Sequence, residues 1–157
     1  MGFEGVELAG TFGHEAGVLR RELGAMGLEI SGAHVPLAEL EADLPGVAEY
    51  YRQAGVTRLI VPWLPEADRQ SADTFVRVGE RLAKLSTRLL PYGLSLFYHN
   101  HDFELVTHQG KWGLEWILLQ APRVRLELDC YWIEKAGHSA VAYLQNHPTH
   151  VPLLHIK

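Results

Sequence analysis

The segment Ala54-Gly55-Val56, followed at once by Leu59-Ile60-Val61, shows the unit from which the chain is built. A helix-like stretch ends in glycine, which adopts the left-handed conformation at a helix end without steric cost, and an apolar β-rich run begins directly after it. The same arrangement surrounds Gly2, Gly27 and Gly93. Strands that alternate with helices favour parallel pairing through helical crossovers, so the sequence predicts an α/β fold.

Six strands and five helices are expected along the chain. The helix over residues 69–90 has the clearest pattern, because its apolar residues recur at steps of three and four and Pro91 ends it. The expected strands are residues 4–8, 28–34, 57–62, 94–99, 124–129 and 151–156. The expected helices are residues 14–25, 37–54, 69–90, 111–121 and 138–146.

Six βα units are too many for a two-layer ferredoxin-like domain. They fit either an open doubly wound sheet or most of a (β/α)8 barrel, which normally has about 250 residues. The motifs G-x-G-x-x-G and G-x-x-x-x-G-K-[ST] do not occur in the sequence, so dinucleotide and P-loop binding lose their main support. Because no linker or low-complexity segment interrupts the pattern, residues 1–157 are expected to form a single domain.

Composition excludes several classes of protein. The 14 Lys and Arg against 19 Asp and Glu give a net charge of −5, which argues against non-specific nucleic-acid binding. Hydrophobic residues make up 47% and charged residues 21%, as in a soluble globular domain. No apolar run approaches the roughly 20 residues of a membrane helix, and no signal peptide is visible. Cys130 is the single cysteine, so we expect a reducing, cytoplasmic location.

Polar residues stand at the carboxyl end of nearly every expected strand. A parallel strand that is buried on both faces should be apolar throughout, and the carboxyl ends of barrel strands converge on the active-site face. The pattern therefore predicts a shared functional site at this end of the sheet. The residues are Glu7, His34, Trp63, His99, His101, Asp129, His155 and Lys157.

This set is rich in imidazole and carboxylate groups. Such a mixed nitrogen and oxygen donor set suits Mn²⁺, Co²⁺, Zn²⁺, Fe²⁺ or Mg²⁺. Cys130 would point away from Asp129 on an alternating strand, so it is expected to be a small buried hydrophobe. Glu127 shares the face of Asp129 at a deeper position, either as a buried polar partner or as a carboxylate that orients the ligands.

For the tryptophans and the remaining histidines, a purely structural role is an alternative to a functional one. Trp63 and Trp132 are either core aromatics or the walls of a sugar pocket. His99 and His101 share one face if the strand continues regularly through Asn100. Five further histidines in helix or loop contexts are expected on the solvated surface. They are His14, His108, His138, His147 and His150.

Five segments carry a resemblance to a known family. They are Phe3-Glu4-Gly5-Val6-Glu7-Leu8, Ser31-Gly32-Ala33-His34, Tyr98-His99-Asn100-His101-Asp102-Phe103-Glu104, Glu127-Leu128-Asp129-Cys130-Tyr131-Trp132 and Pro152-Leu153-Leu154-His155-Ile156-Lys157. In this order they resemble the sugar phosphate isomerase/epimerase family, which has the xylose isomerase-like TIM barrel. The resemblance implies an incomplete (β/α)8 barrel of about six parallel βα units, truncated at both ends.

The resemblance also implies a divalent metal ion held at the strand ends by Glu, Asp, His and Glu. Asp129 and His155 match the Asp and His of that set. Members with epimerase activity carry a Glu on the strand that here reads Leu96-Phe97-Tyr98-His99, and this sequence has none there. The candidates for the first ligand are therefore His99, His101 and Glu104, and the last Glu is expected beyond Lys157.

The expected activity is that of a metal-dependent isomerase or epimerase that transfers a proton next to the carbonyl of a sugar, a sugar phosphate or a keto-sugar. A lyase or dehydratase of a keto-polyol or keto-glycoside, similar to the inosose dehydratases, is the first alternative, and a non-catalytic barrel fragment is the second. A DNA-repair nuclease like endonuclease IV, which shares the barrel, is disfavoured by the acidic charge.

Each candidate residue has an expected role. The expected metal ligands are His101, Glu104, Asp129 and His155. The expected catalytic residues are Glu7, His34, Glu104 and Lys157, and the expected substrate contacts are His34, Trp63, His99 and Trp132. The expected partner is a small sugar or keto-sugar, without nucleic acid or membrane, and a homo-oligomer is compatible with the sequence.

Overall fold

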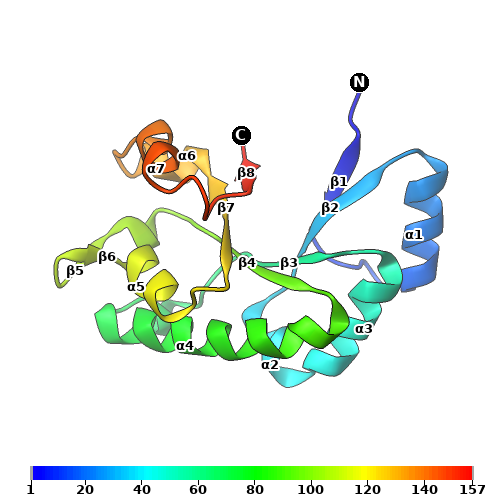
Figure 1. Ribbon diagram of the computed structural model, residues 1–157, viewed down its shortest axis with the longest axis horizontal. Coiled ribbons are helices and arrows are strands. Elements are labelled where there is room, and N and C mark those ends of the chain that lie inside the picture. Colours follow the sequence, from blue (N-terminus) through cyan, green and yellow to red (C-terminus); the bar gives the residue numbers. More distant parts are fainter. Residues whose placement is uncertain (1, 157) are drawn as a thin grey trace.

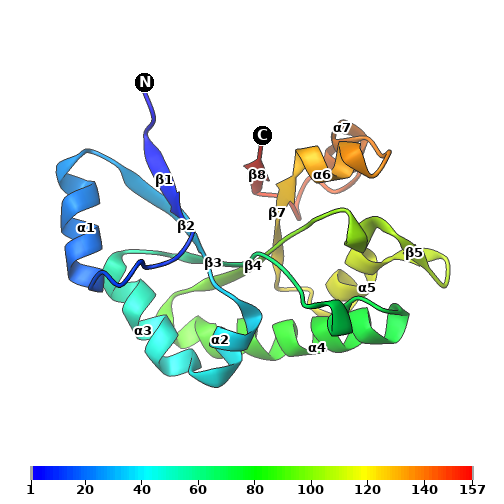
Figure 2. The ribbon, with the colours of Figure 1, turned by 180° about the vertical axis from the view of Figure 1, so that it is seen from behind.

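A computed structural model describes residues 2–156 and contains a curved sheet of six parallel strands (Figure 1). The strand order is β1-β2-β3-β4-β7-β8, which confirms the predicted incomplete TIM barrel. The sheet curves so that its two edge strands, β1 and β8, rise on the same side of the molecule (Figures 1 and 2). The strands are β1 (Gly5–Leu8), β2 (Glu29–His34), β3 (Arg58–Val61), β4 (Ser95–His99), β7 (Arg125–Asp129) and β8 (Leu153–His155).

Helices connect the strands, and α4 lies along the outer side of the sheet (Figure 1). The helices are α1 (Ala16–Ala25), α2 (Leu37–Ala42), α3 (Leu44–Ala54), α4 (Ala72–Leu89), α5 (Gly113–Gln120), α6 (Cys130–Lys135) and α7 (Ala140–Asn146). The short 3-10 turns are η1 (Glu66–Asp68), η2 (Leu90–Tyr92) and η3 (Phe103–Leu105), and a separate hairpin joins β5 (Thr107–His108) to β6 (Lys111–Trp112). Within the described residues, no helix combines the length and apolar character needed to cross a membrane.

The single helix predicted over residues 37–54 is wrong, because the chain breaks at Asp43. The backbone of Asp43 leaves the helical region, and its carboxylate accepts a hydrogen bond from the Gly46 N–H at 3.0 Å. Pro45 follows in the first turn of α3, where a missing N–H costs nothing. The side-chain cap therefore starts a new helix instead of continuing α2.

Helix α6 and the β5–β6 hairpin were not predicted from the sequence. Asp129 ends β7 and caps α6 at once, since its Oδ1 accepts the Trp132 N–H at 2.9 Å. A strand residue that doubles as a helix cap leaves no loop residues between the two elements. The pattern of residues 124–132 gives no helix period long enough to reveal this change.

The core is built as the helical pattern predicted. Phe75, Val78 and Leu82 on α4 are fully buried, and Leu85 and Leu89 continue the same face. This face packs against the sheet and α5. Helix α4 begins with a reciprocal capping box between Ser71 and Thr74, which satisfies backbone donors at its first turn.

The strand register aligns the polar carboxyl ends. His99 pairs with Glu127 across β4 and β7, and Asp129 pairs with His155 across β7 and β8. Residues in register on neighbouring parallel strands are about 4.8 Å apart and point to the same side. The register alone therefore brings these four side chains to one edge of the sheet.

Gly79 provides a test of the α4–α5 contact. A Cβ at this position would lie 2.6 Å from the Ile117 carbonyl oxygen and 2.7 Å from Gln120 Cβ. We expect Gly79→Ala to lower the free energy of unfolding by about 2 kcal/mol through overpacking, measured by urea denaturation. The matched control is Gly24→Ala in α1, where a Cβ meets no atom within 4 Å and where we expect a gain of roughly 0.5 kcal/mol. Equal effects of the two changes would contradict the close packing of α5 on Gly79.

Candidate active site at the carboxyl ends of the strands

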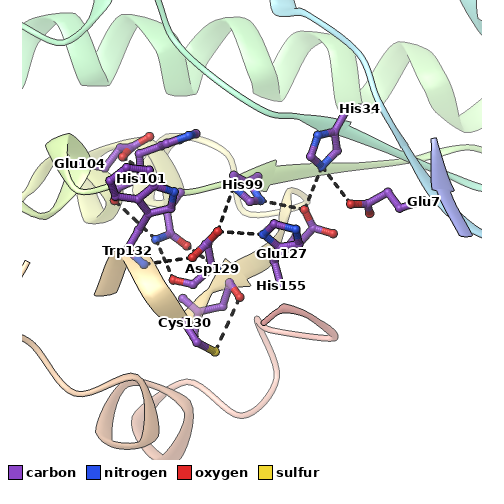
Figure 3. Close-up of polar contacts among 12 residues, drawn as sticks. Glu7, His34, His99, His101, Glu104, Glu127, Asp129, Cys130, Trp132 and His155 are labelled. Atoms are coloured by element: carbon purple, nitrogen blue, oxygen red, sulfur yellow. Dashed lines mark hydrogen bonds and ion pairs between the residues drawn. The ribbon is translucent and has the colours of Figure 1, made fainter. Parts of the chain in front are cut away.

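Acidic and imidazole side chains from β1, β2, β4, β7 and β8 alternate in a series of contacts at the strand ends (Figure 3). His34 Nε2 lies 3.1 Å from Glu7 Oε2 and 3.1 Å from Glu127 Oε2. Glu127 Oε2 also lies 2.8 Å from His99 Nδ1. One carboxylate on β7 therefore links imidazoles from β2 and β4.

The series continues from β4 to the other edge of the sheet. The second nitrogen of His99, Nε2, lies 3.5 Å from Asp129 Oδ2, and His155 Nδ1 lies 2.8 Å from the same oxygen. The whole series is called the strand-end array below. It consists of Glu7, His34, His99, Glu127, Asp129 and His155.

The array has a buried floor and a more accessible upper layer. Asp129 is completely buried, and His99 and Glu127 are each 3% exposed. The side chains of Glu7, His34 and His155 are 23%, 20% and 36% exposed. A small molecule that enters from solvent would therefore meet Glu7, His34 and His155 before it meets the floor.

Mutual hydrogen bonding controls the protonation of the array. Burial acts to lower the pKa of His34, but hydrogen bonds to Glu127 and Glu7 outweigh it and raise this pKa to about 9. Burial acts to raise the pKa of Glu127, and the hydrogen bonds from His34 and His99 hold it well below its usual range instead. At neutral pH the pair is therefore an imidazolium and a carboxylate.

Asn100 fixes the position of Asp129. This fully buried amide accepts the Asp129 N–H at 2.9 Å through Oδ1, and its Nδ2 donates to the Asp129 carbonyl oxygen at 3.4 Å. Because Asp129 Oδ1 is used by the Trp132 N–H, its Oδ2 is directed to His99 and His155. Asn100 is not among the site residues predicted from the sequence, where its signal is an amide at the end of a buried strand.

Glu104 and His101 occupy a neighbouring network, to the left of the array in Figure 3. Glu104 is completely buried, and its two oxygens accept the Tyr98 hydroxyl at 2.5 Å and the His101 N–H at 2.8 Å. Burial raises the pKa of Glu104 to about 7, although these hydrogen bonds oppose the rise. The Glu104 carboxylate therefore holds the loop after β4 in place.

Aromatic rings border the site. Trp63 is 48% exposed, and the Arg69 guanidinium lies 5.0 Å from its ring and 4.3 Å from the Phe103 ring. The His101 ring lies 5.1 Å from Trp132 and stacks on Phe103 at 5.7 Å. These rings present flat apolar faces beside polar groups.

Two groups of side chains could hold a metal ion, with all ligand atoms of a group within 4.8 Å of one another. They are His99, Asp129 and His155, and His34, His99 and Glu127. Within residues 2–156, His101 and Glu104 belong to neither group. The structure thus brings together two of the four predicted ligands, Asp129 and His155, and adds His99.

The remaining residues singled out in the sequence lie outside the strand-end array or outside the described residues. Lys157 lies outside the described residues. Cys130 opens α6 with its Sγ 3.9 Å from the Leu128 carbonyl oxygen, and it packs half-buried against the core. His14 and His150 are exposed as predicted. The prediction for His108, His138 and His147 is wrong, because these are half-buried against aromatic rings.

Known proteins share this fold. No protein-family model matches the sequence, and no curated protein is similar to it in sequence. The solved structures that are similar include a sugar phosphate isomerase/epimerase from Parabacteroides distasonis, with 21% identity and a TM-score of 0.87 over 99% of this chain and 68% of that chain. A second protein of the same description and organism has 21% identity and a TM-score of 0.82 over 93% of this chain and 58% of that chain.

More distant structures have the same architecture. An L-ribulose 3-epimerase has 13% identity and a TM-score of 0.75 over 99% of this chain and 60% of that one. An AP endonuclease of family 2 from Brucella melitensis has 15% identity and a TM-score of 0.74 over 99% of this chain and 69% of that one. The chain therefore has the xylose isomerase-like TIM-barrel fold, as the sequence resemblance implied, and spans about three fifths to two thirds of these relatives.

The buried carboxyl of Glu104 should make stability depend on pH. Its pKa of about 7 exceeds the usual 4.5, so the folded state binds the proton more tightly, and the stability contributed by Glu104 is lost as pH rises from 4.5 through 7. We expect Glu104→Gln, which keeps the shape and acceptor, to be more stable than the wild type by roughly 2 kcal/mol at pH 8 and by much less at pH 5.

This difference is measured by urea denaturation of both proteins in chelator-treated buffer. Comparison of the two proteins at each pH cancels the contribution of His34, whose stabilisation is present below pH 6.5 and declines as pH rises through about 9. A difference that stays constant between pH 5 and pH 8 would show that Glu104 is ionised in the fold at both pH values.

Proposed function

We propose that this chain belongs to a divalent-metal-dependent isomerase or epimerase of sugars, sugar phosphates or keto-sugars, which acts by proton transfer next to a carbonyl. The observation that carries the proposal is the meeting of His99, Asp129 and His155 at the carboxyl ends of β4, β7 and β8. Active sites of TIM-barrel enzymes lie at this face. The fold shared with sugar phosphate isomerase/epimerase proteins supports the same assignment.

The donor set fits a divalent cation. Two imidazole nitrogens and a carboxylate oxygen suit Zn²⁺, Mn²⁺, Co²⁺ or Fe²⁺ and leave coordination positions for oxygens of a substrate. A bound cation would act as a Lewis acid that polarises the substrate carbonyl. Asp129 is held in the orientation that this role requires by Asn100 and the Trp132 N–H.

Glu7 and His34 are the residues best placed to move a proton. Both reach the solvent-facing side of the array, and their side chains lie 3.1 Å apart. The Glu7 carboxylate would take the proton from the carbon next to the carbonyl, and the protonated His34 would hold Glu7 in position. Trp63 would pack against the sugar ring, and His101 and Trp132 would close the opposite wall.

A lyase or dehydratase acting on a keto-polyol or keto-glycoside is the second candidate. It is favoured by His99, an imidazole on the strand where the epimerase members of the resembled family carry Glu. A two-glutamate epimerase needs a carboxylate base on this strand, and an imidazole that binds a cation cannot take that role. The carbanion would then lose a neighbouring hydroxyl or aglycone instead of being reprotonated.

DNA hydrolysis is a weaker alternative, although the AP endonuclease has the same fold. The net charge of −5 opposes the phosphate contacts that give such enzymes most of their affinity. We also propose a cytoplasmic location, which the single cysteine supports.

The metal ligands are tested by substitution. We expect Asp129→Asn and His155→Gln each to weaken the binding of Zn²⁺ or Mn²⁺ by at least about 10-fold, since each change removes a donor from a small set. Binding is measured by isothermal titration calorimetry, with elemental analysis of dialysed protein. The control is His150→Gln, which replaces an exposed histidine close in sequence to His155 and should bind the metal as the wild type does. Unchanged binding in both ligand variants would refute the assignment.

Product analysis distinguishes the two reactions. The metal-loaded protein is incubated with a panel of keto-sugars and inososes in D₂O and followed by NMR. An isomerase or epimerase should give isomeric products with deuterium at the carbon next to the carbonyl, because Glu7 would exchange its proton with solvent. Loss of water or of an aglycone would identify the lyase instead, and deuterium incorporation unaffected by Glu7→Gln would contradict the role of Glu7.

A further inference from the structure

Arg69 is a half-buried cation at the border of the site, and its charge has no carboxylate partner in the described part of the chain. It directly follows η1 in the loop after β3, so it lies at the face where the carboxyl ends of the strands meet. Its guanidinium contacts the rings of Trp63 at 5.0 Å and Phe103 at 4.3 Å. Among residues 2–156, this guanidinium forms no ion pair and no hydrogen bond. A charge that is partly removed from water and not compensated favours the binding of an anion.

The loop that carries Arg69 is held on both sides. The preceding residue, Asp68, is bound by Arg81 of α4, whose Nη1 lies 2.7 Å from Asp68 Oδ2. The capping box of Ser71 and Thr74 fixes the chain just after Arg69. Asp68 is therefore already paired and does not neutralise Arg69, and the fixed loop presents the guanidinium in one place.

A second cation on the aromatic border shows what Arg69 lacks. Lys135 Nζ lies 4.1 Å from the Trp132 ring, and Asp102 Oδ2 lies 3.3 Å from the same nitrogen. Both cations thus rest on aromatic rings beside the site, but only Lys135 has a carboxylate. The missing counterion of Arg69 is a place for an acidic group of a ligand.

The geometry of the guanidinium favours a carboxylate over a phosphate. Its N–H groups form a planar fork that matches the two oxygens of a carboxylate, and its single positive charge equals the single negative charge of that group. Phosphate sites add backbone N–H groups, often at a helix N-terminus. The nearest helix start, that of α4, instead carries Asp73, and its Thr74 N–H already donates to Ser71 Oγ.

We propose that Arg69 binds a carboxylate of the substrate, and that the substrate is therefore a sugar acid with its carbonyl at one end and its carboxylate at the other. The carbonyl belongs to the proposed function, on which this inference rests, and the carboxylate is additional to it. The planar fork of Arg69 donates two N–H groups to the two carboxylate oxygens.

A short series of contacts joins Arg69 to the strand-end array. The Arg69 guanidinium lies 4.3 Å from the Phe103 ring, the Phe103 ring lies 5.7 Å from the His101 ring, and the His101 ring lies 5.2 Å from the His99 ring. The carboxylate is thereby kept apart from the acidic groups of the array, which would repel it. A sugar with its carbonyl at the array extends along these rings, with Trp63 beside its far end.

Recognition of the carboxylate is tested on the wild type with two probes of the same shape. D-glucuronate and its neutral amide, D-glucuronamide, are titrated by calorimetry in chelator-treated buffer, so that the acid cannot bind through a metal ion. We expect the acid to bind at least about 10-fold more tightly than the amide, because hydrogen bonds between charged groups are the stronger ones. Equal affinities would overturn the inference. D-glucose 6-phosphate should bind more weakly than the acid, and tighter binding of this phosphate would overturn the choice of carboxylate.

The role of Arg69 itself is tested by substitution and by NMR. Arg69→Gln should bind the acid and the amide equally, whereas Lys135→Gln, which replaces the cation already paired with Asp102, should keep the wild-type preference. A preference that survives in Arg69→Gln would overturn the assignment. In the wild type, the Nε–H resonance of Arg69 should shift with D-glucuronate and not with D-glucuronamide. An unshifted resonance would have the same meaning, so the question is decided even if Arg69→Gln misfolds.

The outcomes separate this inference from the proposed function. Isomeric products from neutral keto-sugars, together with equal binding of the acid and the amide, would overturn the role of Arg69 and leave the proposed function intact. Binding of D-glucuronate that depends on Arg69 would support the carboxylate site even if the metal-loaded protein isomerised no sugar, and the proposed function alone would then fail.

Discussion

The register of the parallel strands is the constraint on which the site depends. In neighbouring parallel strands, paired residues project to the same side at a fixed separation of about 4.8 Å. Once His99 is opposite Glu127 and Asp129 is opposite His155, imidazole and carboxylate must meet. A shift of one residue in either pairing would turn these side chains to the opposite face. Packing of the apolar residues therefore sets the geometry of the polar ones.

Burial of the acidic groups is the main energetic cost of this arrangement. Asp129 and Glu127 are almost completely removed from water, and an isolated buried carboxylate is strongly unfavourable. Histidines offset this cost by hydrogen bonding: His34 and His99 keep the pKa of Glu127 low, and His155 bonds to Asp129. Imidazole and carboxylate are also donor groups that divalent cations accept, so the same side chains could hold a metal ion.

Alternation along β4 separates structural from chemical roles. Tyr98 points into the apolar core and donates to Glu104, whereas His99, the next residue, points to the opposite side and joins the array. Asn100 then ties the end of β4 to the backbone of Asp129. Three consecutive residues thus anchor a loop, add an imidazole to the strand-end array and align two strands. This division explains why Glu104, three residues beyond His101, supports the site from outside.

The sequence by itself determined the order of strands and helices, the apolar face of α4 and the strand ends that carry Asp129 and His155. These features follow from periodicity and from glycine and proline positions, which act over short distances in the chain. Only the tertiary structure decided that His99 groups with Asp129 and His155, and that Glu127 links two imidazoles. The physical reason is that β4 ends at His99 and the chain then turns into η3. The alternation of side chains along a strand, from which a sequence pattern predicts their direction, therefore does not extend to His101 and Glu104.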